Sequence, residues 1–395
     1  MKGPNRVAFP WHRNRMELAM KNNSTVRFVA HLILGLAALG STPAADVRGE
    51  TNKNLYPVDQ NGKWGFINEQ GQLVIKPAFE RVAYFSEGVA AVGIDGRFGY
   101  IDEAGKIVIE PWFGYGFAFD EGLAWVEGSA TMGFIDKTGK VVVFSPNGTY
   151  CRRFRDGLAR TMPIPPRPMP QLIRAAPPET SPLPPLLDGP DFVPAPRRPV
   201  GFIDKTGDYA FPTKFDAAWD FREGLAAAEI DKKWGFIDRT GDFVVPAQFE
   251  SAYFFSEGLA AVTVSGKTIF IKKDGKRAIE VEYEEAYNFA EGLSAFKSEG
   301  KWGFIDKSGA VVIEPKFDGV SSFSSGRASI VTNQKYGYID RKGNVIVEPK
   351  YDYGHSYLGE LAGVTFHPER GDGAGTGYID RAGRVVWAPE PKAKD

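Results

Sequence analysis

Three short segments carry the residue types of an enzyme with a serine nucleophile. Ser294-Ala295-Phe296-Lys297 places a serine three residues before a lysine, and Ser145-Pro146-Asn147 and Lys205-Thr206-Gly207 complete the motif set of serine penicillin-recognising enzymes. The three motifs occur here in the wrong order along the chain, and Ser294 lies in an expected strand rather than at the start of a helix. Chance matches to such short patterns are common. The sequence therefore favours a protein that is not an enzyme.

The other reactive residues do not form a recognisable site. Only His355 and His367 follow the N-terminal region, and the chain contains no HExxH, CxxC or GxSxG pattern. Single aspartates recur about once per 34 residues, which is too sparse for the oxygen ligands of a calcium site. Cys151 is the only cysteine and can form no intramolecular disulfide. We expect no catalytic residues, no metal and no cofactor.

Charge and the N-terminal pattern limit the location and the partners. The 395 residues include 48 Lys and Arg against 49 Asp and Glu, so the chain lacks the basic surplus of a nucleic-acid-binding protein.

An apolar run at 28–39 is followed by small residues up to Ala44 and Ala45, which predicts a leader and signal peptide over 1–45, cleaved near Ala44 or Ala45. The run is shorter than the roughly 20 residues of a membrane helix. We expect an exported protein, periplasmic or extracellular, with no membrane span after cleavage.

A repeat of 34 residues organises the rest of the chain. The tetrapeptide Trp64-Gly65-Phe66-Ile67 recurs, and a second landmark, Phe-x-Glu-Gly, follows most copies after 23 residues. Nine copies run from about Leu55 to Pro389, so the sequence predicts a repeat array over 55–162 and 200–390 and a tail at 391–395. The signature positions are Trp64, Gly65, Gly99, Gly133, Gly201, Trp234, Gly235, Trp302, Gly303, Gly337 and Gly377.

Each repeat is expected to form a short antiparallel three-stranded meander. An Asp-x-x-Gly turn joins the second and third strands, and a proline ends most third strands. Phe66 and Ile67 alternate along one strand, yet both positions are apolar throughout, so neighbouring repeats must cover both faces. An open superhelical array and a β-propeller-like ring both satisfy this. The open form is preferred, because a propeller blade usually takes ~40–45 residues and no strand is left over to close a ring.

A proline-rich insertion interrupts the array at 163–199, between the first and second strands of one repeat. It holds 14 of the 28 prolines, which favours a flexible surface loop, with docking to an aromatic groove as the alternative. A basic cluster flanks the insertion and is interpreted as solvated surface, with contact to an anionic envelope as the alternative. Its members are Arg152, Arg153, Arg155, Arg197 and Arg198.

The repeat signature resembles the WG-repeat family, also called KWG repeats. Lys233-Trp234-Gly235-Phe236-Ile237-Asp238 and Lys301-Trp302-Gly303-Phe304-Ile305-Asp306 match it best. Thr268-Ile269 lacks both signature residues, and Met132 and Val200 replace the tryptophan, so looser packing is expected there. The resemblance implies a bacterial, often exported, interaction or scaffold protein, and it supplies no catalytic residues.

Two functions remain open from the sequence. The first is a protein-interaction scaffold in the cell envelope that binds an unidentified envelope protein, since repeat arrays offer long surfaces. The second is a module that binds glycan or peptidoglycan of the cell wall, because aromatic rings stack on sugars. The candidate ligand-facing aromatics lie outside the repeating pattern: Trp112, Tyr115, Trp125, Trp219, Tyr253 and Tyr287.

Overall fold

A computed structural model of the chain describes residues 54–128, 132–146, 149–162, 199–366 and 375–389. These residues form nine antiparallel sheets of three or four strands and no α-helix, which confirms the all-β repeat array. Accordingly, none of the described segments is a helix with the length and hydrophobicity needed to cross a membrane. The leader and residues 163–198 of the insertion lie outside the described residues.

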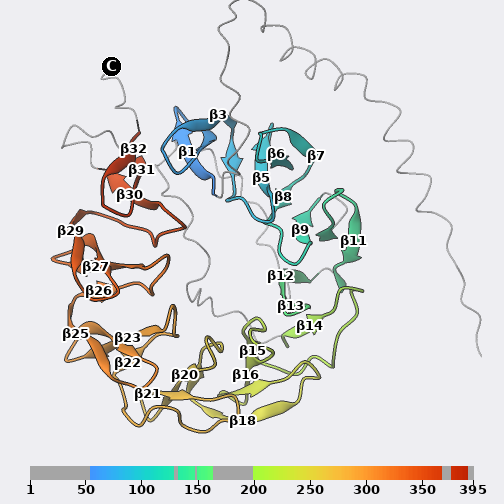
Figure 1. The fold of residues 1–395 in the computed structure, drawn as a ribbon. Coiled ribbons are helices and arrows are strands. Elements are labelled where there is room, and N and C mark those ends of the chain that lie inside the picture. Colours follow the sequence, from blue (N-terminus) through green and yellow to red (C-terminus); the bar gives the residue numbers. More distant parts are fainter. Residues whose placement is uncertain (1–53, 129–131, 147–148, 163–198, 367–374, 390–395) are drawn as a thin grey trace, which may run out of the picture. The chain divides into compact units, whose positions relative to one another are not determined.

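The nine sheets, called blades 1 to 9 in chain order, follow one another around a ring (Figure 1). Blades 1 to 3 consist of β1 (Tyr56–Gln60), β2 (Lys63–Ile67) and β3 (Leu73–Phe79); β4 (Arg81–Val82), β5 (Val89–Ile94), β6 (Arg97–Asp102) and β7 (Ile107–Phe113); β8 (Tyr115–Gly116), β9 (Ala124–Glu127), β10 (Met132–Ile135) and β11 (Val141–Phe144). Blades 4 to 6 consist of β12 (Tyr150–Arg155), β13 (Leu158–Met162) and β14 (Gly201–Ile203); β15 (Ala217–Ala218), β16 (Ala226–Ile230), β17 (Lys233–Ile237) and β18 (Phe243–Phe249); β19 (Ser251–Ala252), β20 (Ala260–Val264) and β21 (Lys267–Ile271).

Blades 7 to 9 complete the array. They consist of β22 (Glu285–Ala286), β23 (Leu293–Ser298), β24 (Lys301–Asp306) and β25 (Val311–Phe317); β26 (Gly319–Val320), β27 (Arg327–Thr332), β28 (Lys335–Asp340) and β29 (Val345–Tyr351); β30 (Ala362–Phe366), β31 (Gly375–Ile379) and β32 (Val385–Trp387). Each blade begins at its inner edge, and its last strand lies at the rim (Figure 1).

Six blades contain an inner strand of only two residues, which the sequence patterns do not predict. These strands are β4, β8, β15, β19, β22 and β26. A strand this short has no periodicity of its own, because its pairing depends on the neighbouring strand. Its brevity also explains how a 34-residue repeat can supply a four-stranded blade.

The array is a closed nine-bladed β-propeller, so the preference for an open superhelix is wrong and the ring is the architecture found. Blade 9 packs directly on blade 1: Tyr56, Val58 and Ile67 share one buried cluster with Leu361 and Tyr378. The preference for the open form required a spare strand to lock the ring. The structure instead closes it with side-chain packing and hydrogen bonds, which need no exchanged strand.

Packing between blades explains the signature residues. Phe66 and Ile67 are fully buried on opposite faces of β2, where they join the cluster shared with blade 2 and the one shared with blade 9 respectively. Gly303 lies against the bulge of the outer strand, where an added Cβ would approach the nitrogen of Pro315 to 2.7 Å. Only glycine leaves room for this crossing.

One departure from the signature has a visible consequence. Ile269 replaces the glycine in β21 of blade 6, and the segment that follows forms only isolated bridges, Thr268 to Tyr283 and Ile271 to Arg277, in place of an outer strand. Blade 4 has the same broken outer segment although Gly201 is present. At Met132 the outer strand β11 is retained, shortened to four residues. The outer strand is therefore lost in two of the three blades, while Val200 and Thr268 themselves are buried, so looser packing at these positions stays a prediction.

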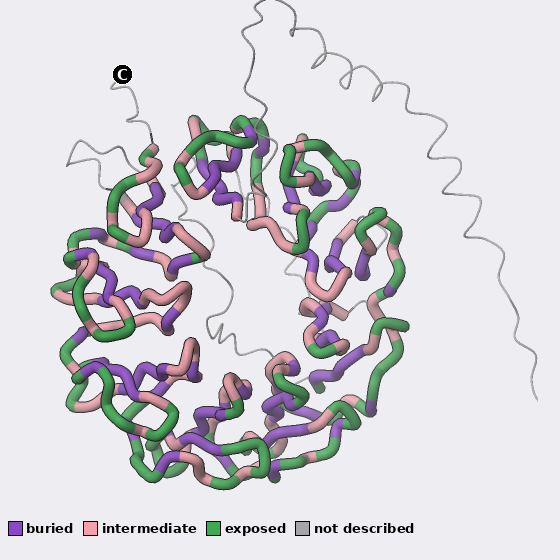
Figure 2. Tube along the Cα trace, viewed as in Figure 1, coloured by how far each residue is buried: buried purple, intermediate pink, exposed green. Residues whose placement is uncertain are grey.

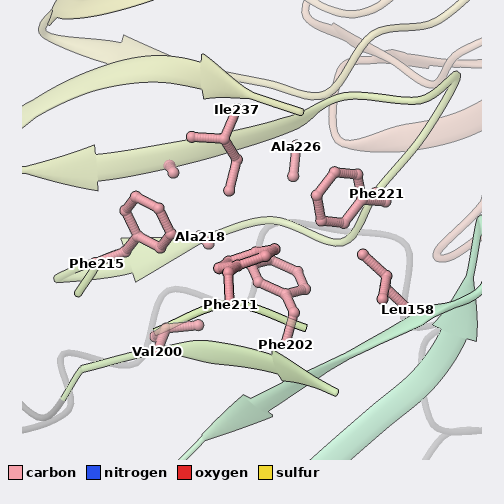
Figure 3. Close-up of a cluster of buried hydrophobic side chains, with 10 residues drawn as sticks. Leu158, Val200, Phe202, Phe211, Phe215, Ala218, Phe221, Ala226 and Ile237 are labelled. Carbon is pink, nitrogen blue, oxygen red and sulfur yellow. The ribbon is translucent and has the colours of Figure 1, made fainter. Parts of the chain in front are cut away.

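The hydrophobic core is a series of clusters, most of which join two adjacent blades. Figure 3 shows the one between blades 4 and 5, in which Leu158 and Phe202 of blade 4 meet Phe221 and Ile237 of blade 5. In Figure 2 the buried segments alternate with exposed turns in every blade. Each blade thus depends on its neighbours for burial of its apolar faces.

Candidate functional site

The blades are joined by a repeated contact at the Phe-x-Glu-Gly turn. Its aromatic residue packs on the signature aromatic of the preceding blade, as Phe255 does on Phe236 with ring centroids 4.6 Å apart. The glutamate has a positive φ, 54° at Glu257, and its carboxylate accepts the N–H of the corresponding glycine, Gly292, in the next blade. The same bond joins six successive seams: Glu87–Gly122, Glu121–Gly157, Asp156–Gly224, Glu223–Gly258, Glu257–Gly292 and Glu291–Gly326.

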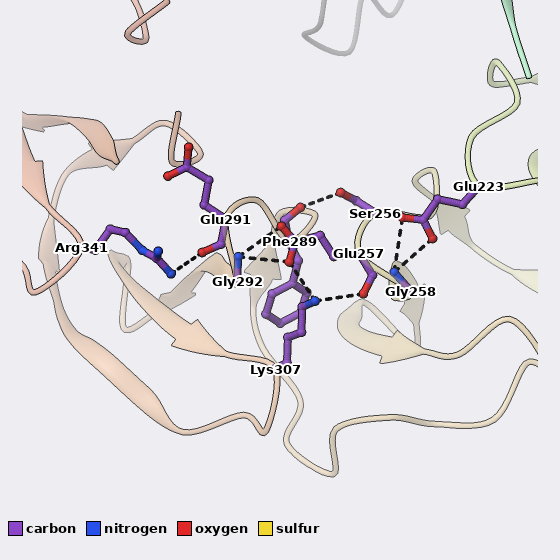
Figure 4. Close-up of polar contacts among 9 residues, drawn as sticks. All are labelled: Glu223, Ser256, Glu257, Gly258, Phe289, Glu291, Gly292, Lys307 and Arg341. Atoms are coloured by element: carbon purple, nitrogen blue, oxygen red, sulfur yellow. Dashed lines mark hydrogen bonds and ion pairs between the residues drawn. The ribbon is translucent and has the colours of Figure 1, made fainter. Parts of the chain in front are cut away.

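A lysine from the Asp-x-x-Gly turn of the next blade, or from the equivalent Lys272–Gly275 turn in blade 6, completes this carboxylate clamp at four seams. Lys307 lies 2.9 Å from a carboxylate oxygen of Glu257 and also donates to its backbone carbonyl (Figure 4). Burial alone would raise the pKa of Glu257, but the bonds from Lys307 and Gly292 lower it below its usual value. The clamp therefore holds a charged carboxylate between blades, and its recurrence at equivalent positions of four seams indicates a structural role.

The candidate ligand-facing aromatics fall into two groups. Trp112 and Tyr115 are 66% and 45% exposed, in β7 of blade 2 and β8 of blade 3. Trp125 is buried against Phe134 and Tyr150. The remaining three are half-buried in packing contacts. Trp219 stacks on Trp234 and donates to the carbonyl of Ala252, Tyr253 joins the cluster between blades 6 and 7, and Tyr287 packs on Trp302.

Phe144 at the end of β11 is an exposed aromatic that the sequence reasoning missed. It is 64% exposed, and its register opposite Gly133 places it where other blades have Glu110, Glu314 and Glu348. The alignment of repeats could have found it, because a large apolar ring replaces a charged residue. Trp112 shows the same substitution, since its equivalents include Lys316 and Lys350. The two exposed rings lie on the outer strands of adjacent blades.

The residues of the serine-enzyme motifs are separated by the fold. Ser294 lies in β23 of blade 7, fully buried, and its hydroxyl donates to the carbonyl of Tyr287 at 2.6 Å. Ser145 is in blade 3, and Lys205 pairs with Glu121 across the seam of blades 3 and 4. These motifs do not form one site.

The other reactive groups are equally constrained. Burial raises the pKa of the Cys151 thiol to about 12, which keeps it neutral. Burial lowers the pKa of His355, and His367 lies outside the described residues. No group of three or more His, Cys, Asp or Glu side chains suited to a metal ion occurs in the described part of the chain.

Comparison with solved structures gives matches of low sequence identity. A chain described as a eukaryotic initiation factor is 12% identical, with a TM-score of 0.53 over 86% of this chain and 100% of that one. PorZ, a bacterial surface component of the type-IX secretion system of Porphyromonas gingivalis, is 11% identical, with a TM-score of 0.28 over 87% of this chain and 53% of that one. At these identities the first likeness supports the propeller architecture alone.

Sequence comparison identifies the family. No curated protein matches the chain. The family model described as WG containing repeat matches it eight times, at 64–97, 98–127, 132–162, 201–234, 234–267, 270–302, 302–336 and 336–366. These matches cover most of the nine-bladed array, and the chain therefore belongs to the WG-containing repeat family.

Proposed function

We propose that this WG-repeat protein is an exported, non-catalytic interaction scaffold of the cell envelope that binds a partner protein through the rim of blades 2 and 3. The main support is the pair of exposed aromatic residues Trp112 and Phe144. Each side chain is about two-thirds exposed, and equivalent positions in other blades hold charged residues. Exposed aromatic rings are enriched at protein interfaces because they bury a large area for few rotatable bonds. The rigid array of clamped blades would hold this surface in a fixed shape.

Glycan binding is the alternative, and one observation favours it. Trp112 presents a ring 66% exposed at the rim, and a flat aromatic face can stack on a sugar. The packing of Trp125, Trp219 and Tyr287 against neighbouring rings leaves few rings for an extended sugar platform. Protein binding is therefore the first choice.

The repeats themselves supply the test variants. Trp112→Lys and Phe144→Glu introduce residues that equivalent positions already carry, so both should fold. The mature chain would be compared with each variant for capture of envelope proteins and for binding to purified peptidoglycan. Val244→Lys, at an exposed apolar position of β18 in blade 5, is the matched control.

The scaffold proposal expects a defined captured protein that both rim variants lose and the control retains. Peptidoglycan binding that depends on Trp112, without such a protein, would replace it with the glycan alternative. Export has its own test: N-terminal sequencing of the protein from its host should give a start near Ala45 or Asp46 in an extracytoplasmic fraction. An intact leader on a cytoplasmic product would contradict export.

A further inference from the structure

The inner strand of blade 4 contains a β-bulge that places two arginines together. Cys151 pairs with Thr161 and Phe154 pairs with Ala159, so Arg152 and Arg153 stand opposite the single residue Arg160. The extra residue is visible in the sequence, because the glycine of this repeat arrives one position late. Bulges of this kind redirect side chains and are frequent beside functional sites.

Arg160 is an arginine at a position otherwise occupied mostly by small residues. Its cross-strand partner is Phe202, and the residues with the same pairing in other blades include Ala91, Ala227, Ala261 and Ala295. Packing between blades does not require a guanidinium there, since alanine fills the position in four other blades.

Arg160 points across the seam into blade 5. It is 8% exposed, its Nε lies 2.9 Å from a carboxylate oxygen of Asp220, and Nη1 donates to the carbonyl of Ala218. The guanidinium carbon lies 5.8 Å from the centroid of the Trp219 ring. Burial lowers the pKa of Arg160 while Asp220 opposes that shift, so Asp220 already balances this charge.

Arg152 has no counter-charge among the residues that the structure describes. Its Nε is buried without a hydrogen-bond partner there, and no carboxylate of the described ranges forms an ion pair with it. The register at the bulge sets Arg152 opposite Arg160 on the neighbouring strand, and the charge of Arg152 contributes to lowering the pKa of Arg160. On the other side of β12, Arg153 and Arg155 share the single carboxylate of Asp120, at 3.7 and 3.2 Å.

We propose that Arg152, beside the Arg160–Asp220 pair, forms a binding site for one oxyanionic group, a carboxylate or a phosphate, at the inner edge of blade 4. A buried N–H donor without an acceptor is unfavourable, and a guanidinium fork matches the oxygens of these groups. The arginine surplus on β12 also attracts an anion to this edge. This site is separate from the rim of blades 2 and 3 and does not depend on the scaffold proposal.

The test is titration calorimetry of the full chain at low ionic strength, with inorganic phosphate in one arm and succinate in the other. We expect at least one of the two ligands to bind. The ligand that binds more tightly shows whether the site prefers a phosphate or a carboxylate. Arg152→Gln should weaken binding by about tenfold or more, the loss expected for one charge-assisted hydrogen bond. Arg152→Lys keeps the charge without the fork and should retain part of the affinity.

Arg81→Gln is the matched control, because Arg81 is an exposed arginine on the inner strand β4 of blade 2. This variant should bind as the unmodified chain does. An unchanged β-sheet circular dichroism spectrum in each variant separates loss of binding from loss of folding. The site would be overturned if the unmodified chain bound neither phosphate nor succinate. It would also be overturned if Arg152→Gln bound as tightly as the unmodified chain, or if Arg81→Gln lost as much affinity as Arg152→Gln.

Discussion

The carboxylate of Glu257 in blade 6 accepts the backbone N–H of Gly292 in blade 7, at 3.2 Å to one oxygen and 3.1 Å to the other. The bond crosses a seam between separate sheets that share no strand. Seams are therefore held by side-chain packing and by this clamp, and the stability of the ring should respond locally to changes at each seam.

Glu257→Ala should lower the free energy of unfolding by about 1–2 kcal/mol, because it removes the acceptor for Gly292 and the partner of Lys307 at a partly exposed site. Chemical denaturation measures the change. Glu299→Ala is the control, since Glu299 is an exposed glutamate with a similarly positive φ of 51° at a turn of blade 7. Equal effects of the two substitutions would show that the clamp contributes nothing.

Trp302→Ala should cost about 3–5 kcal/mol, because the ring is 6% exposed and packs on Tyr287. Trp234→Ala should cost less, since Trp234 is only half-buried. Backbone amides should exchange fastest in the blade that carries the substitution, because each blade contacts only its neighbours. If both proteins keep their melting temperature and lose envelope binding, the rings form a ligand platform rather than a structural contact.

The Asp-x-x-Gly turns should make the ring sensitive to acid. The hydroxyl of Ser308 and the N–H groups of Ser308 and Ala310 donate to Asp306 and lower its pKa. The pKa is also lowered at Asp136, Asp204, Asp238, Asp340 and Asp380. A carboxylate whose pKa is lowered by folding stabilises the protein above its unfolded pKa of about 3.9, and this contribution is lost as the pH falls through the folded value.

Melting temperature should therefore fall below about pH 4. Asp306→Asn should reduce the steepness of this fall while keeping the turn, because Asn68 accepts the N–H groups of Gln70 and Gln72 in the same way in blade 1. A pH profile of melting for the two proteins measures the difference. Identical slopes would show that these turns do not govern the acid response.

Tyr378→Phe should weaken the closure of the ring. The Tyr378 hydroxyl donates to the carbonyl of Pro57 at 2.9 Å, and its loss leaves that buried carbonyl without a partner, at a cost of about 1–3 kcal/mol. Tyr100→Phe removes the equivalent bond to Phe117 between blades 2 and 3. Hydrogen exchange should rise in β1 and β31 for the first variant and in β6 and β8 for the second. The same exchange pattern in both would contradict local closure.

Arg160→Ala should destabilise the seam between blades 4 and 5 by about 2–4 kcal/mol, because it leaves Asp220 without its ion pair. Arg160→Ala combined with Asp220→Asn recreates the Ala261 and Asn288 combination found between blades 6 and 7. The double variant should be more stable than the single one, as denaturation of both would measure. Additive losses would show that the two residues act independently.

The local structure of each repeat follows from short-range patterns. The recurrent Trp-Gly-Phe-Ile predicts a strand covered on both faces, and Phe66 and Ile67 are buried in two different clusters. The turn from Asp306 to Gly309 also depends only on nearby residues. It is confirmed by the bonds that Asp306 accepts from the N–H groups of Ser308 and Gly309, and by the positive φ of Gly309. The two-residue inner strands escape prediction, because pairing with a neighbour is their only signal.

The candidate surfaces were harder to predict, because exposure depends on contacts between distant residues. Trp112 and Trp219 were both predicted to face a ligand, yet the first is exposed and the second stacks on Trp234. The basic cluster by the insertion was expected to be a solvated surface. The structure places Arg153 and Arg155 beside Asp120 of the preceding blade, and the bulge brings Arg152 beside Arg160.

The sequence by itself determined the family, the nine repeats, the strand that carries the signature and the turn that follows it, because each depends on residues within one repeat. The tertiary structure decided whether the array closes. Closure depends on the small rotation between successive blades summed over nine of them, and on whether Tyr56 meets Leu358 and Tyr378 from the opposite end of the array. Neither quantity is encoded in a single repeat, so the ring could not be distinguished from an open superhelix until the seam itself was seen.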